Sequence, residues 1–64
     1  MNKLKQYREK AAMSQLQLSI ESGINVRMIQ HYEQGVKDMN KANAITIYKL
    51  SKALGCNMED LIEL

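Results

Sequence analysis

Apolar residues recur along this chain at intervals of three and four, which is the period of amphipathic helices. Leu4, Tyr7 and Ala11 share one side of a stretch whose other positions are mostly charged, so the sequence predicts a first helix that ends near Ala12. No stretch alternates apolar and polar residues as a half-buried strand would. The pattern therefore indicates an all-α fold.

A second, short helix is predicted after a clear start signal. Ser14 is followed three positions later by Gln17, a capping-box pattern in which each side chain can satisfy a backbone N–H at the helix start. The helix is expected over residues 15–22, because Gly23 can adopt a positive φ and turn the chain away.

A third helix is predicted almost immediately afterwards, over residues 26–34. Asn25 can cap its start and Gly35 can end it. Two short helices can cross steeply only where a small residue lies between them, and Ser19 meets that requirement. Residues 14–35 are therefore predicted to form a helix-turn-helix. Its core-facing positions are apolar: Leu18, Ile24, Ile29 and Tyr32.

The remaining third of the chain predicts two more helices after a polar connection over residues 36–42. Asn43 can cap a fourth helix, which Gly55 ends. Asn57 with Asp60 three positions later forms a second, weaker capping box that would open a fifth helix. The apolar residues of that fifth helix are Leu61, Ile62 and Leu64.

Composition limits what such a chain can do. With 64 residues, 45% of them hydrophobic and none of them Pro, the chain can build one domain with one core and no deep catalytic cleft. The net charge is only +2, but residues 1–37 hold six basic and three acidic side chains. Positive charge therefore collects in the half that carries the helix-turn-helix, as a DNA-facing surface requires.

Several functions are disfavoured by the residues that the chain lacks. Its single cysteine, Cys56, allows no internal disulfide and is expected to be a small packed residue in a cytoplasmic protein. One histidine gives no metal-ligand spacing, and we expect no metal, cofactor or small-molecule ligand. A capping Ser14 near His31 is no nucleophile, so the chain is not predicted to be an enzyme. No apolar run suggests a membrane span or a signal peptide.

The helix-turn-helix residues carry a resemblance to a known family. The chain is similar to the phage Cro and repressor type (Xre-like) helix-turn-helix regulators over nearly its whole length. The residues that match are Ser14, Gln15, Gly23, Ile24, Asn25, Ile29, Tyr32, Glu33, Gln34 and Gly35, with Leu4, Tyr7, Arg8 and Met13 before them and residues 48–50, 52–55 and 58–61 after them. The resemblance implies a compact five-helix, lambda-repressor-like domain whose third helix enters the major groove of double-stranded DNA.

The resemblance also assigns roles to individual residues. The base-reading positions are Val26, Arg27, Met28, Gln30 and His31. The positions expected at DNA phosphates are Ser14, Gln15, Asn25, Gln34, Lys37, Asn40 and Lys41. Arg8 is expected to pair with Glu33 as a structural brace. Arginine can pair with guanine through two hydrogen bonds, which makes Arg27 the main candidate for specificity.

The family implies a bacterial or phage transcriptional regulator, and we expect a repressor that acts as a homodimer. The expected dimer surface is the chain end, with Ile45 beside it; its residues are Met58, Leu61, Ile62 and Leu64. The initial Met and the absence of a trailing linker favour a complete protein.

Two features depart from the family pattern. The connection over residues 36–43 is longer than usual and lacks a Pro, and Leu16, Ile20 and Ile45 are apolar where polar residues are usual. Leu16 and Ile20 are one turn apart, so they predict an apolar pair on the outside of the second helix. The alternative function is therefore a protein-interaction module, such as an antitoxin, that holds a partner on this face.

Overall fold

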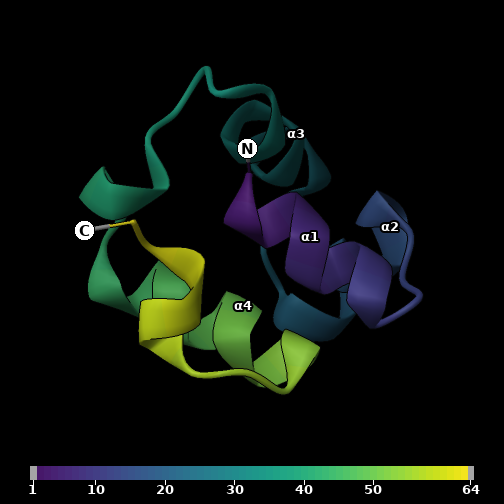
Figure 1. Ribbon diagram of the computed structural model, residues 1–64. Helices are drawn as coiled ribbons and strands as arrows, with labels where there is room; N and C mark the ends of the chain where they lie inside the picture. The colour runs from purple at the N-terminus through teal and green to yellow at the C-terminus, as the bar shows by residue number, and fades with distance from the viewer. Residues whose placement is uncertain (1, 64) are drawn as a thin grey trace.

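The computed structural model describes residues 2–63, and those residues contain helices and no strand. Figure 1 shows α1 at the centre of the view, with α3 above it, α2 to its right and α4 with the end of the chain below it. The elements are α1 (Lys3–Lys10), α2 (Gln15–Ser22), α3 (Val26–Gln34), η1 (Met39–Lys41), α4 (Ala44–Leu54) and η2 (Met58–Leu61), where η marks a short 3-10 helix.

The predicted boundaries of the second, third and fourth helices are confirmed, because the residues at their ends act as caps. The Ser14 side chain accepts from the backbone N–H of Gln17 at 3.0 Å, and Asn43 does the same for the start of α4. Gly23 and Gly35 adopt φ values of 75° and 79° directly after α2 and α3. The Gln17 side-chain nitrogen donates to Glu21 one turn later on the same helix at 3.1 Å.

The first helix ends two residues earlier than its apolar pattern predicted. α1 stops at Lys10, and Ala12 adopts a left-handed conformation with φ 57°. The backbone N–H of Ala12 bonds to Glu9 O and that of Met13 bonds to Arg8 O, which satisfies the last carbonyls of the helix. The apolar spacing that ends at Ala11 thus extends one residue beyond the last residue of the helix.

The predicted fifth helix is wrong: the chain makes only the single turn η2 and then becomes extended. Leu61 is 1% exposed and inserts into the core, which fixes the turn in place. Ile62 then has φ −111° and ψ 155°, and Lys3 Nζ donates to its carbonyl oxygen at 2.9 Å. A contact with the start of α1 therefore holds the extended segment after η2.

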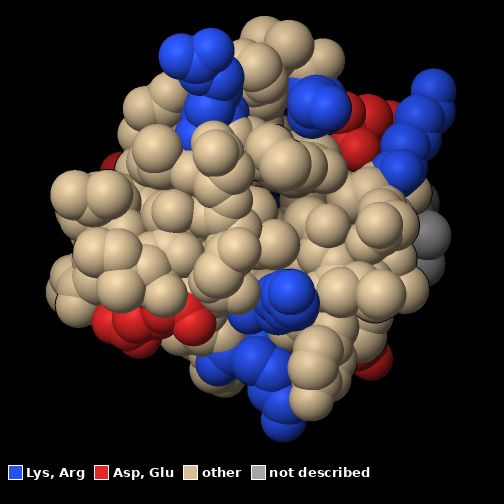
Figure 2. Space-filling model, turned by 180° about the vertical axis from the view of Figure 1, so that it is seen from behind, with Lys and Arg blue, Asp and Glu red and all other residues tan. Residues whose placement is uncertain are grey.

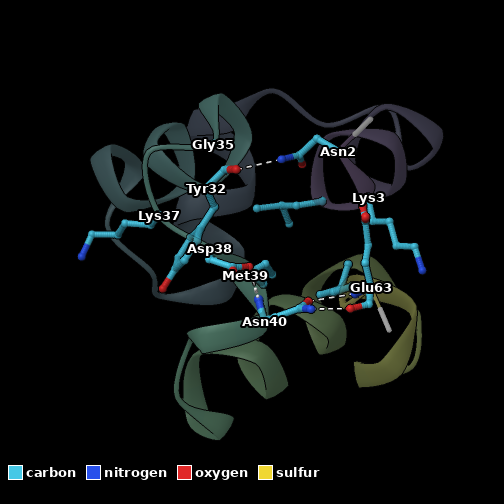
Figure 3. A pocket seen from close by; sticks show the side chains of 11 residues that line it. Asn2, Lys3, Tyr32, Gly35, Lys37, Asp38, Met39, Asn40 and Glu63 are labelled. Carbon is cyan, nitrogen blue, oxygen red and sulfur yellow. Dashed lines mark hydrogen bonds between the residues drawn. The ribbon is translucent and has the colours of Figure 1, made fainter.

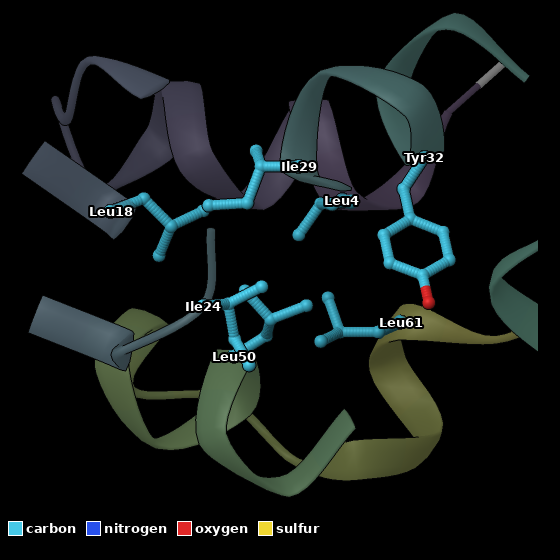
Figure 4. Close-up of a cluster of buried hydrophobic side chains, with 7 residues drawn as sticks. All are labelled: Leu4, Leu18, Ile24, Ile29, Tyr32, Leu50 and Leu61. Atoms are coloured by element: carbon cyan, nitrogen blue, oxygen red, sulfur yellow. The ribbon is translucent and has the colours of Figure 1, made fainter. Parts of the chain in front are cut away.

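One hydrophobic cluster joins all the α-helices and η2, and Figure 4 shows its side chains converging between α1, the helix-turn-helix and α4. The cluster consists of Leu4, Leu18, Ile24, Ile29, Tyr32, Leu50 and Leu61. Met13, Met28 and Met39 pack against its edge, as does Cys56. Tyr48 lies outside this cluster: it is 50% exposed, and the Lys52 ammonium lies over its ring.

Candidate nucleic-acid interface

The turn between α2 and α3 is held by two serine hydroxyls of α2. Ser19 Oγ donates to the carbonyl oxygen of Ile24 at 2.6 Å, and the backbone N–H of Ile24 donates to Ser22 Oγ at 3.1 Å. Both backbone groups of Ile24 are thus paired while its side chain enters the core. The sequence identified Ser19 only as a small residue, and the role of Ser22 was missed. The signal available was a pair of serines just before a turn glycine.

Helix α3 has one buried side and one outward side. Ile29 and Tyr32 are 0% and 5% exposed, and they anchor the helix on the core. Arg27 is exposed on the first turn, and His31 and Gln34 follow it at spacings of four and seven along the same helix face. A side of α3 that presents donors and acceptors is therefore open at the surface.

The other predicted base-reading residues are less open to solvent than Arg27. His31, Val26, Gln30 and Met28 are half-buried. Met28 also packs against the hydrophobic cluster, so part of its side chain is already used inside the domain. Asn25 caps α3 by accepting from the backbone N–H of Arg27 at 2.8 Å, which commits its side-chain oxygen to the helix.

Arg8 and Glu33, the expected brace, are in direct contact between α1 and α3. Arg8 Nε lies 2.7 Å and Arg8 NH2 lies 3.0 Å from the two carboxylate oxygens of Glu33. The hydrogen bonds to Glu33 raise the pKa of Arg8 above its ordinary value, although burial opposes this. Gln15 Nε2 donates to the same carboxylate at 3.0 Å, a contact that the sequence did not predict.

The connection between α3 and α4 places the predicted phosphate-binding residues in different surroundings. Lys37 and Lys41 are exposed. Asn40 is instead tied to the end of the chain: its Oδ1 accepts from the backbone N–H of Glu63 at 2.8 Å, and its amide donates to Glu63 O. These two bonds use the Asn40 oxygen and one of its two amide hydrogens, so its predicted phosphate contact would have to come from the remaining hydrogen.

A pocket lies where these segments meet the start of α1 (Figure 3). Its lining includes Asn2, whose amide donates to Tyr32 O at 2.7 Å, together with Lys3, Asn40 and Glu63. In Figure 3 the dashed lines cross this pocket from one chain segment to another. These polar groups hold the chain ends and the connection together.

The predicted dimer residues are not all at the surface. Leu61 is buried in the core, so its assignment to a dimer surface is wrong. Met58 and Ile62 are half-buried, Ile45 is 64% exposed, and Leu64 lies outside the described residues. Any dimer contact on this side must therefore use less of the chain end than expected.

Positive charge forms no continuous patch on the face of the molecule that Figure 2 shows. Figure 2 shows the face opposite to that of Figure 1, where Lys and Arg side chains stand apart at the upper and lower edges and form no continuous basic patch. This agrees with the net charge of only +2. Binding to DNA would therefore depend strongly on the geometry of individual contacts.

Comparison with known proteins identifies the family to which the chain belongs. Residues 4–61 match a protein family described as helix-turn-helix, a span that includes every helix from α1 to η2 almost completely. No curated protein and no solved structure matches the chain. Within residues 2–63, no helix has the length and apolar character needed to cross a lipid bilayer.

Proposed function

The chain belongs to the Cro/C1-type (Xre-like) helix-turn-helix family of DNA-binding transcription regulators, and we propose that it recognises a specific DNA sequence by placing α3 in the major groove. The observation that carries this proposal is the division of α3 into two sides. Ile29 and Tyr32 fix the helix on the core, while Arg27 and His31 face away from it. A rigidly held helix with outward polar side chains is what major-groove recognition needs.

Arg27 has the central role in reading bases in this proposal. Its exposed guanidinium can donate two hydrogen bonds to a guanine, and His31 and Gln30, one turn further along, can read neighbouring bases. Val26 can contact a thymine methyl group, with a smaller contribution from the half-buried Met28. Specificity should therefore depend mainly on the first two turns of α3.

Phosphate contacts would orient α3 in the groove. Ser14 and Gln15 lie at the start of α2, where backbone N–H groups have no helical acceptor. The other proposed contacts come from Asn25, Gln34, Lys37 and Lys41. A domain that covers its DNA site in this way would act as a repressor by excluding other proteins from that site.

Selection from a random DNA library at stated salt tests this function. We expect one enriched motif, and Arg27→Ala should reduce discrimination at one position of that motif by about 1–3 kcal/mol. Lys37→Ala should instead weaken all sequences to a similar extent and lower the salt dependence. If no motif is enriched and binding follows salt alone, sequence-specific regulation is wrong.

A second candidate function rests on the outer face of α2. Leu16 and Ile20 are 61% and 74% exposed and one turn apart, so they form the predicted apolar pair on the outside of the helix. A partner protein such as a toxin could be held there. Leu16→Asp should then abolish capture of that partner while DNA binding stays unchanged, whereas Arg27→Ala should reduce base discrimination and leave partner capture unchanged.

A further inference from the structure

The side chain of Gln15 is held in place by a carboxylate that belongs to another helix, α3. We propose that Glu33 is a positioning residue that fixes the Gln15 amide before DNA arrives, so that a phosphate meets an already oriented donor. This inference rests on the proposed function, since it concerns how one of the proposed phosphate contacts is prepared.

Glu33 is well suited to fix another side chain because it can hardly move itself. Its side chain is 3% exposed, and three N–H donors converge on its two oxygens. Two of these donors come from Arg8, whose remaining nitrogen NH1 donates to Met13 O at 2.8 Å. The carboxylate is therefore held by a guanidinium that is itself anchored to the turn after α1.

Gln15 keeps the capacity to bind a phosphate after it has bonded to Glu33. Its amide nitrogen carries two hydrogens, and the contact with Glu33 Oε1 at 3.0 Å uses only one of them. Gln15 is the first residue of α2 and is half-buried, so its remaining N–H lies beside the start of that helix. A long side chain that is already ordered loses less conformational entropy when it binds.

The charge of the cluster also favours this role. A bare carboxylate close to a phosphate would repel it, but Arg8 neutralises Glu33 at 2.7 Å. The raised pKa of Arg8 keeps this guanidinium protonated at every pH at which proteins are folded. The cluster of Arg8, Glu33 and Gln15 thus presents an oriented donor without a net negative charge.

A double-mutant cycle for DNA affinity tests the proposal, using a mixed-sequence duplex at low, stated salt. Gln15→Met removes the amide and leaves the ion pair intact. The double variant Arg8→Met/Glu33→Met replaces the ion pair with apolar side chains, an exchange that folded proteins often tolerate. Gln34→Met is the matched control, because Gln34 is an exposed glutamine of α3 that is also a proposed phosphate contact.

We expect Gln15→Met to weaken binding about tenfold in the natural background. The ion-pair variant, shown by circular dichroism to be folded, should bind about two- to tenfold more weakly. In that variant Gln15→Met should change affinity by less than about twofold, whereas Gln34→Met should have the same effect in both backgrounds. If Gln15→Met has equal effects in both backgrounds, or none in the natural one, the proposal is overturned.

A second measurement needs neither DNA nor the ion-pair variant. In the natural protein without DNA, nuclear magnetic resonance relaxation should find the Gln15 side-chain amide ordered, with an order parameter near about 0.85, and the Gln34 amide below about 0.6. Equal mobility of the two amides would overturn the positioning role. If the amide is ordered but the natural protein binds no duplex, the proposed function fails while the internal contact stands.

Discussion

Ala12 is the one described residue other than glycine that adopts a positive φ, at 57°. A left-handed conformation costs an L-amino acid about 1–2 kcal/mol, and glycine avoids this cost but loses about 0.5–1 kcal/mol in conformational entropy. We therefore expect Ala12→Gly to stabilise the domain by about 0.5–1 kcal/mol, measured by thermal or urea unfolding. Ala11→Gly is the control, because Ala11 has φ −81° and should lose stability instead. A destabilised Ala12→Gly variant would contradict this account of the turn.

Cys56 gives stability a pH dependence at the alkaline end. Partial burial of the thiol, and then the nearby Asp60 carboxylate, raise the pKa of Cys56 above its ordinary value of 9.0. Well below pH 9.0 the thiol is protonated in both the folded and the unfolded chain, so its full contribution to stability is present. As the pH rises above that value, the thiol of the unfolded chain ionises first, and the free energy of unfolding falls.

The difference in free energy of unfolding between the natural protein and Cys56→Ser isolates this effect, since the two proteins differ at no other residue. Measured under reducing conditions, the difference should be constant near neutral pH and should change in favour of Cys56→Ser as the pH rises above about 9. A difference that does not vary with pH would show that the thiol titrates alike in the folded and unfolded chains.

At the scale of the element, caps predicted the structure better than apolar spacing did. α2, α3 and α4 begin and end where Ser14, Asn25, Asn43 and the following glycines predicted, because a cap acts on the backbone groups that decide where a helix starts. The capping pattern of Asn57 and Asp60 also places a helical start at Met58, and Asp60 Oδ2 accepts from the backbone N–H of Asn57 at 2.9 Å, but only the single turn η2 follows. A cap marks where a helix begins and does not decide how many turns it makes. Contacts with residues far away in the sequence, such as that between Lys3 and Ile62, therefore determine the conformation of the segment after Met58.

At the candidate interface, too, the sequence predicted some contacts and not those between residues far apart in the chain. The outward position of Arg27 and the pairing of Arg8 with Glu33 follow from spacing and resemblance, and the structure places these residues accordingly. The attachment of Asn40 to Glu63 joins residues 23 positions apart, and nothing in the local sequence of either residue indicates it. Side-chain amides have many alternative partners, and tertiary packing selects among them.

The turn between α2 and α3 gives a prediction for the helix-turn-helix as a unit. Ser19→Ala removes the donor to Ile24 O, and a buried or half-buried carbonyl that loses its partner costs about 1–3 kcal/mol. Ser51→Ala is the matched control, because the carbonyl of Tyr48 that it serves also lies within α4 and keeps its helical donor. Urea unfolding should show the larger loss for Ser19→Ala, and equal losses would mean that the hydroxyl does not hold the turn.

At the scale of the whole molecule, the two ends of the chain are tied to each other and to the connection that follows α3. Lys3 binds Ile62, Asn2 binds the last turn of α3, and Asn40 binds Glu63. The longer connection over residues 36–43 is thus hydrogen-bonded to the end of the chain through Asn40 and Glu63. Lys37 and Lys41 belong to this connection, so their position relative to α3 depends on the contact between the connection and the chain end.

A domain of this size also limits how tightly one copy can bind. A single recognition module buries only about 600–1,000 Å² of its surface on DNA, so we propose that two copies bind together on a two-fold site. A duplex with two inverted half-sites about 10 base pairs apart should bind at least about a hundredfold more tightly than one half-site. Electrophoretic mobility shifts at fixed salt measure both affinities.

The distance between the two half-sites tests whether the two copies bind as a pair. Insertion of about 5 base pairs rotates one half-site to the opposite face of the duplex, and affinity should then fall to that of a single half-site. With the half-sites at the natural spacing, Ile45→Asp should also reduce affinity to that of a single half-site without changing single-site affinity, because Ile45 is 64% exposed and belongs to the expected dimer surface. Affinity that does not depend on spacing, with monomers alone in ultracentrifugation at high concentration, would mean that each domain reads its DNA independently.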